Sequence, residues 1–181
     1  MWYRLRQHHI GGQTLEMATT LDSHAETSTA KIPAYLTAGD LARIEVLADV
    51  SIIIPTYREA DNIPHVLERI NALRKAYDLT VEVLFMDDCS NDGSVEAVAA
   101  SGYEWAQIIE RTGPRGLSAA VIDGFERARH SVLVCMDGDL SHPAEVIPQM
   151  ILALATGQQF AIGSRYVAGG STDDDWGLFR Y

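Results

Sequence analysis

From Val50 onward, short apolar runs alternate with segments in which apolar residues recur at helical spacing. The apolar runs predict strands at 50–54, 80–86, 104–110, 131–136 and 160–162. Apolar side chains three or four residues apart predict helices at 61–77, 93–100, 117–129 and 143–156, the last with Pro143 in its first turn. Because strands and helices alternate with short links, we expect an α/β, Rossmann-like fold with a mostly parallel sheet and helices on both faces.

Residues 1–49 lack this alternation. The stretch 19–30 is rich in Ser, Thr and Ala and has no apolar period, which is typical of a linker or a disordered tail. We therefore interpret 1–49 as an N-terminal tail or linker, disordered apart from one short helix at 38–47. The folded domain is expected to span 50–181.

Composition narrows the classes of protein. The chain has 181 residues, of which 47% are hydrophobic and 22% charged, as expected for a globular domain. A formal net charge of -11 argues against nucleic acid as a partner, since nucleic-acid binding relies on a basic surface. Two cysteines, Cys89 and Cys135, are too few for a disulfide scaffold, and a reduced, cytoplasmic setting is the expectation.

Polar residues follow every predicted strand. In an open parallel sheet, ligands bind beyond the carboxyl ends of the strands, so these residues are expected to share one crevice. They are Tyr57, Arg58 and Glu59 after the first strand, Asp87 and Asp88 after the second, Arg111 after the third, Asp137 and Asp139 after the fourth, and Arg165 after the fifth.

The pair Asp137 and Asp139 is a candidate metal site. Two carboxylates this close repel each other unless a cation lies between them, and Mg²⁺ or Mn²⁺ suits because either ion also bridges to substrate phosphates. A tight turn is the structural alternative for Asp-Gly-Asp. Arg165 has the planar fork that clamps phosphate, with a solvated arginine as its alternative. One of Asp87 and Asp88 is a candidate ligand for a base or ribose, and the alternative is a turn in which Ser90 or Asp92 caps the next helix.

Five ordered motifs in 51–180 resemble those of the family-2 glycosyltransferases, and within them the dolichyl-phosphate or polyprenyl-phosphate mannose synthases. The matching stretches are 55–63, 86–94, 115–125, 136–143 and 163–170. The resemblance implies a GT-A nucleotide-diphospho-sugar transferase fold and a nucleotide-sugar donor, with GDP-mannose expected. It also implies a lipid-phosphate acceptor at a membrane surface, which the chain would contact peripherally from the cytoplasmic side.

The same resemblance implies roles for individual residues. Those that hold the base and ribose or line their pocket are Pro55, Tyr57, Glu59, Met86 and Asp88. At the diphosphate, Asp137 and Asp139 would bind Mg²⁺ or Mn²⁺, and the Gly138 backbone would lie beside them. Ser141 would complete the coordination shell of the metal, and Arg165 and Arg180 would bind phosphate. The implied reaction is a single displacement at the anomeric carbon by a phosphate oxygen of the lipid, with inversion.

Departures from the family pattern keep alternatives open. Arg58 stands where the family usually has Asn, Gly138 where it has Ala, and the family continues beyond Tyr181. A non-catalytic or inactive nucleotide-sugar-binding fragment is therefore one alternative. A phosphatase with Asp137 as nucleophile and Asp139 as acid is another, although such enzymes need a later Lys and none follows Lys75. The sequence does not distinguish a GDP-sugar donor from a UDP-sugar donor. It also does not identify the sugar, the lipid chain or the oligomeric state.

Overall fold

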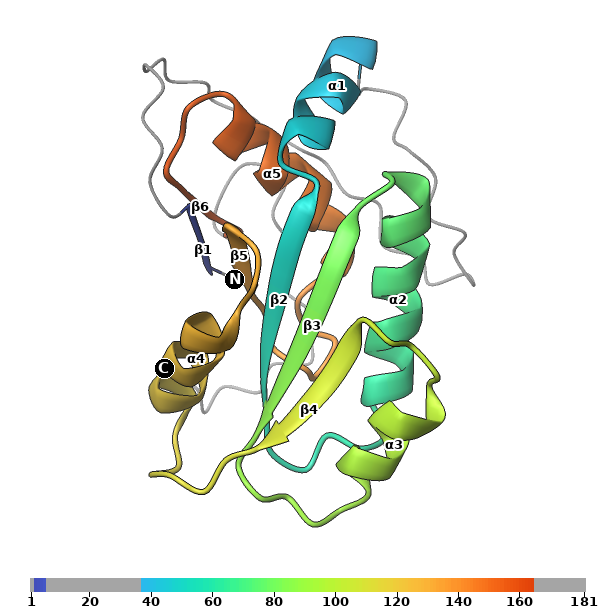
Figure 1. Cartoon of the computed structure of the whole chain (residues 1–181), viewed down its shortest axis with the longest axis vertical. Helices are drawn as coiled ribbons and strands as arrows, with labels where there is room; N and C mark the ends of the chain where they lie inside the picture. Colours follow the sequence, from blue (N-terminus) through green and yellow to red (C-terminus); the bar gives the residue numbers. More distant parts are fainter. Residues whose placement is uncertain (1, 6–36, 165–181) are drawn as a thin grey trace, which may run out of the picture.

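The computed structural model describes residues 2–5 and 37–164, and within them a six-stranded sheet of order β4-β3-β2-β5-β1-β6 (Figure 1). The five predicted strands are present as β2 (Asp49–Thr56), β3 (Thr80–Asp87), β4 (Ala106–Glu110), β5 (Val132–Cys135) and β6 (Phe160–Ile162). Strands β2, β3, β4 and β5 run parallel. The predicted α/β fold with a mostly parallel sheet is confirmed.

Four predicted helices are also present. They are α2 (Ile63–Ala76), α3 (Ser94–Ala100), α4 (Leu117–Arg127) and α5 (Ile147–Ala155). The last of them starts later than predicted, because a 3-10 turn (Ala144–Val146) comes first. Pro148, and not Pro143, therefore occupies the first turn of α5, where a missing N–H costs nothing.

The N-terminal segment differs in part from the expected tail. Strand β1 (Trp2–Leu5) lies between β5 and β6 and pairs antiparallel with both. Four residues are too few to show a strand period, and the partners lie far along the chain, so the sequence analysis missed this strand. The predicted short helix is present as α1 (Ala38–Val46), which begins with a capping box between Thr37 and Asp40. The stretch 19–30 lies outside the described residues.

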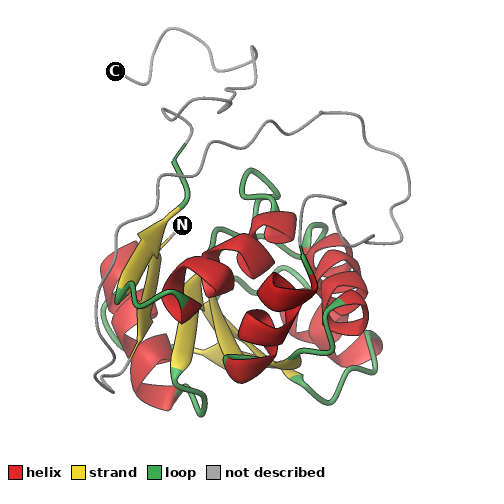
Figure 2. Cartoon of the chain, turned by 90° about the horizontal axis from the view of Figure 1, so that it is seen from above, coloured by secondary structure: helices red, strands yellow, loops and turns green. Residues whose placement is uncertain are grey.

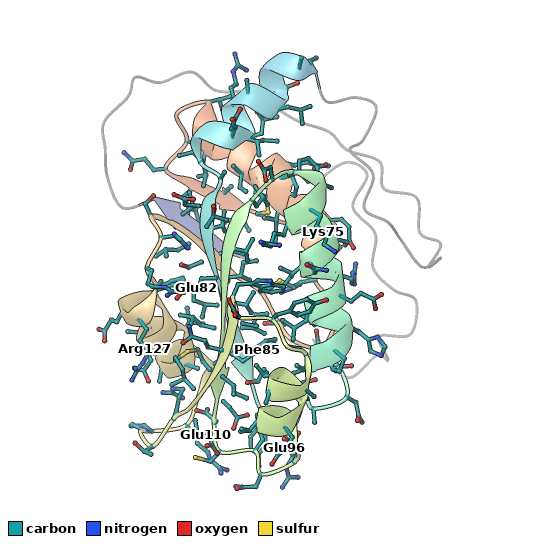
Figure 3. All side chains as sticks on the ribbon, turned by 45° about the vertical axis from the view of Figure 1, so that its right-hand side comes forward. Lys75, Glu82, Phe85, Glu96, Glu110 and Arg127 are labelled. Atoms are coloured by element: carbon teal, nitrogen blue, oxygen red, sulfur yellow. The ribbon has the colours of Figure 1, made fainter. Side chains whose placement is uncertain are left out.

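The two faces of the sheet are covered by different helices (Figure 2). Alternate residues of a strand point to opposite faces. On β3, Val83 and Phe85 (Figure 3) pack in one core cluster with residues of α2 and α5, whereas Leu84 and Met86 pack in a second cluster beneath α4. The prediction of helices on both faces is confirmed within the described residues.

A buried carboxylate ties α4 to the sheet. Glu82 on β3 (Figure 3) accepts a hydrogen bond from the Ser51 hydroxyl at 2.6 Å and from the Arg129 backbone N–H at 2.9 Å. The Arg129 guanidinium adds an ion pair at 2.7 Å. Burial raises the pKa of Glu82, but the hydrogen bonds from Ser51 and Arg129 and the charge of Arg129 outweigh it and leave the pKa below its ordinary value. The link between α4 and β5 is thereby fixed on the sheet.

Candidate functional site

The carboxyl ends of β2, β3, β4 and β5 meet at one edge of the sheet, since these strands are parallel. The loops that follow β2, β3 and β4 lie together at the lower end of the molecule in Figure 1. The register places Pro55 beside Met86 and Thr56 beside Asp87. The Asp88 N–H then donates to the Thr56 carbonyl at 3.1 Å, which holds the loops after β2 and β3 side by side.

The loop after β2 carries Tyr57 and Glu59. Tyr57 is 45% exposed. The guanidinium carbon of Arg58 lies 5.2 Å from the centroid of the Tyr57 ring, and that of Arg115 lies 5.1 Å from it. The Glu59 carboxylate is half-buried and accepts a hydrogen bond from the Asn62 amide at 2.5 Å. Tyr57 is therefore an exposed aromatic ring with two guanidinium groups over it, in cation-π contact.

Asp88 is held from two sides. Its Oδ1 accepts from the Arg111 guanidinium, and its Oδ2 accepts from the Gly116 N–H at 2.9 Å. The Arg111 side chain is 3% exposed and also donates to Asp123 at 2.8 Å and to the Pro114 carbonyl at 3.1 Å. Hydrogen bonding to Asp123 raises the pKa of Arg111, burial opposes this, and the charge of Asp88 adds to the increase. Asp88 is consequently held in a fixed orientation.

The acidic motif after β5 comes close to the loop after β2. Gly138 is buried, and a Cβ there would lie 3.4 Å from Cγ2 of Thr56 and 3.8 Å from Cγ of Glu59. The backbone between Asp137 and Asp139 therefore contacts the segment that carries Tyr57 and Glu59. A larger side chain than Ala at 138 would push these two loops apart.

Both acids of the motif are within reach of a ligand. The Asp137 side chain is 46% exposed, and its backbone N–H donates to Nδ1 of His142 at 3.0 Å. Asp139 is exposed and accepts the Ser141 N–H at 3.0 Å. Burial raises the pKa of Asp139, but the hydrogen bonds from Ser141 and the charge of His142 outweigh it and lower the pKa below its ordinary value. Asp139 is therefore ionised at neutral pH, as a metal ligand must be.

The carboxylates of Asp137 and Asp139 suit a metal ion that also takes ligands from a substrate. Within 2–5 and 37–164 there is no group of three His, Cys, Asp or Glu side chains that could enclose a metal. Two exposed carboxylates leave most of the coordination sphere to water and phosphate oxygens, which is the way Mg²⁺ is usually bound and a chemistry that suits Mn²⁺. The residues present thus fit the predicted divalent ion at Asp137 and Asp139.

The other predicted residues divide into four groups. Pro55, Tyr57, Glu59, Asp88 and Gly138 lie at the shared edge, as the positions of their strands require. The Met86 side chain is fully buried beneath α4, so it belongs to the core. Ser141 is exposed beside Asp139. Arg165 and Arg180 lie outside the described residues.

Two arginines were not singled out as site residues by the sequence analysis. Arg111 appeared there only as a strand-end residue, and Arg115 only within a motif. Their contacts with Asp88 and Tyr57 join loops that are far apart in the sequence, so no local pattern could have indicated them. The single sequence signal was their place after a predicted strand.

A cavity of about 310 Å³ lies beside this edge, next to the start of α3. Its lining includes the carboxylates of Asp87, Asp92, Glu96 and Glu110 (Figure 3 labels the last two). Four acids repel the phosphates of a nucleotide. This cavity is therefore a poor place for a nucleoside diphosphate, and of the described candidate residues at the strand ends only Asp87 lines it.

The fold is that of the GT-A class of nucleotide-diphospho-sugar transferases. Two solved structures of glucosyl-3-phosphoglycerate synthase from Mycobacterium tuberculosis superpose with a TM-score of 0.56 each, at 23% and 22% identity. They cover 70% and 80% of this chain, which spans 47% and 49% of theirs. At this level of identity the likeness establishes the fold.

The chain belongs to glycosyl transferase family 2, whose profile matches residues 51–180. It is 43% identical over 137 residues to a dolichol-phosphate mannosyltransferase of Mycosarcoma maydis and 44% identical over 133 residues to one of Pyrococcus furiosus. These matches cover 72% of this chain, but only 46% and 37% of the relatives. The chain thus spans about half the length, or less, of these curated relatives. The match leaves the phosphatase alternative without support.

Proposed function

We propose that this chain is the donor-binding and catalytic part of a glycosyltransferase that moves mannose from GDP-mannose to a polyprenyl or dolichyl phosphate. The observation that carries the proposal is the close similarity to dolichol-phosphate mannosyltransferases, within a family match that includes every predicted site residue. The geometry agrees, because a fixed carboxylate, an exposed aromatic ring and a pair of acids come to one edge of the sheet.

The base and ribose of the donor belong, in this proposal, at the ends of β2 and β3. Tyr57 offers an exposed ring, and Asp88 offers acceptor oxygens whose orientation is set by Arg111 and the Gly116 N–H. Glu59, half-buried next to Gly138, is placed to accept hydrogen bonds from ribose hydroxyls. The diphosphate then extends toward Asp137 and Asp139, with Arg165 and Arg180 as further phosphate ligands outside the described residues.

Asp137 and Asp139 would hold the divalent ion, with Ser141 next to them. When bound, the ion supplies positive charge that stabilises the leaving nucleoside diphosphate. The two acids would position the ion, and the lowered pKa of Asp139 keeps the Asp139 carboxylate ionised. A lipid phosphate is already an anion at pH 7, so the nucleophile needs no protein base, and attack from the opposite side of the sugar gives inversion. Mn²⁺ accompanies UDP in the glucosyl-3-phosphoglycerate synthase structure, and we propose Mg²⁺ or Mn²⁺ here.

The acceptor would be met at a membrane surface, with the chain on the cytoplasmic side. No helix in the described parts of the chain combines the length and the apolar character needed to span a bilayer. The lipid phosphate is proposed on the strength of the relatives' activity alone.

A transfer assay tests the proposal. The chain is incubated with GDP-mannose, Mn²⁺ and a short-chain polyprenyl phosphate in detergent, and mannosyl phospholipid is detected by mass spectrometry. We expect a metal-dependent product with inverted anomeric configuration. GDP binding without transfer would support the alternative of a non-catalytic donor-binding fragment. Absence of both binding and transfer would contradict the proposal.

A further inference from the structure

Two arginines converge on one exposed tyrosine at the candidate site. Arg58 follows β2 and Arg115 precedes α4, yet their guanidinium carbons lie 5.2 and 5.1 Å from the centroid of the Tyr57 ring. Among residues 2–5 and 37–164, neither arginine makes an ion pair with a carboxylate, although the chain carries a net charge of -11. Two cations without a counter-ion at a ligand-binding edge are available for an electron-rich ligand.

The backbone of Arg58 is in an unfavourable conformation. Its φ of 63° lies in the left-handed region, which suits Gly or Asn and costs other residues energy. The Arg58 N–H donates to the Ser90 hydroxyl at 2.9 Å, which holds the backbone in place. Arginine thus occupies a position at which asparagine would be the easier choice.

The neighbouring carboxylate indicates the kind of ligand. Among the described residues, each oxygen of Asp88 accepts one hydrogen bond and keeps a lone pair free. A carboxylate with two free acceptor sites suits the adjacent N1–H and N2–H donors of guanine, whereas uracil offers it one donor. The other edge of guanine carries the acceptors O6 and N7, which match the donors of an arginine fork.

We infer that Arg58 and Arg115, which Tyr57 supports from below through its ring, are specificity-determining residues that bind the acceptor edge of guanine, while Asp88 holds its donor edge. This inference rests on the proposed function, because it concerns the base of the same donor. A phosphate group fits this position less well than a base does. The Gly116 N–H, next to Arg115, donates to the Asp88 carboxylate, and this negative charge would repel a phosphate. The diphosphate has its own candidate ligands at Asp137 and Asp139.

The test compares nucleotides across three variants of the whole chain. Dissociation constants for GDP, ADP and UDP with Mn²⁺ are measured by calorimetry for the wild type, Arg58→Asn and Arg115→Gln. Arg127→Gln is the matched control, because Arg127 is an exposed arginine at the far end of α4 (Figure 3) and its loss changes the net charge equally. Asn at 58 relieves the left-handed strain, so that variant is expected to fold.

We expect each site variant to weaken GDP binding about tenfold and ADP or UDP binding much less, with no change in the control. Equal losses of affinity for all three nucleotides would show that the guanidinium groups bind the diphosphate. Unchanged GDP affinity would show that they do not contact the nucleotide. Either result overturns the inference and leaves the proposed function standing. A wild type that binds none of the nucleotides would refute both.

Discussion

Arg111 and Asp88 form a buried ion pair that joins the end of β3 to the loop after β4, with the side chains 3% and 12% exposed. Asp123 and the Pro114 carbonyl accept two further hydrogen bonds from the same guanidinium. The pair therefore links the fold and the candidate site, because the group that stabilises the loop also orients a carboxylate proposed to bind the donor.

Replacing Arg111 by Met is expected to destabilise the protein by about 3 kcal/mol, because it leaves the Asp88 carboxylate buried without its cation. Urea unfolding followed by circular dichroism measures the change. Arg127→Met is the control, since Arg127 is exposed and its loss is expected to change the free energy of unfolding by less than about 0.5 kcal/mol. Similar losses in both variants would contradict a special role for the buried pair.

Replacing Asp137 or Asp139 by Asn is expected to remove the dependence of GDP binding on Mn²⁺, because a neutral amide is a weak ligand for a hard cation. Thermal shifts with GDP, recorded with and without Mn²⁺, measure this dependence. Asp49→Asn is the control, as Asp49 is exposed at the start of β2, on the opposite edge of the sheet. The metal assignment would be wrong if both site variants kept the full Mn²⁺ effect.

Glu82 predicts a pH dependence of stability. Its pKa is below the ordinary 4.5 in the folded protein, so its contribution is complete above that pH and is lost as the pH falls through the folded value. Glu82→Gln is expected to cost about 1–3 kcal/mol at pH 7, because charged hydrogen bonds to Ser51 and Arg129 are weakened. The cost should shrink toward pH 3. Unfolding curves at several pH values test this, with exposed Glu104→Gln as control; a cost that does not change with pH would contradict it.

Gly124 predicts a packing limit beneath α4. A Cβ there would lie 2.5 Å from Cγ2 of Ile53 and 3.1 Å from Cγ of Met86. Gly124→Ala is therefore expected to destabilise the protein by about 1–2 kcal/mol, even though Ala favours a helix, because the buried side chains must move. Gly113→Ala, where a Cβ meets no atom within 4 Å, is the matched control. Thermal melts compare the two, and a more stable Gly124→Ala would refute the close packing.

The order of helices and strands could be predicted from the sequence, because hydrophobic periodicity is a local property. It gave β2 to β6 and α2 to α5 within a few residues, apart from the delayed start of α5 after its 3-10 turn. The polar strand ends followed from the same pattern, and parallel pairing then places Tyr57, Asp88 and Asp137 at one edge. Their roles in binding stay predictions.

The alternation of helices and strands, and the polar residues that end each strand, can thus be derived without coordinates. Tertiary structure alone decided that β1 enters the sheet between β5 and β6, that Arg111 holds Asp88, and that Arg115 meets Arg58 at Tyr57. The physical reason is that these contacts depend on which strands become lateral neighbours and how their loops pack. Both are set by burial and hydrogen bonding across the whole chain, and neither leaves a period in the local sequence.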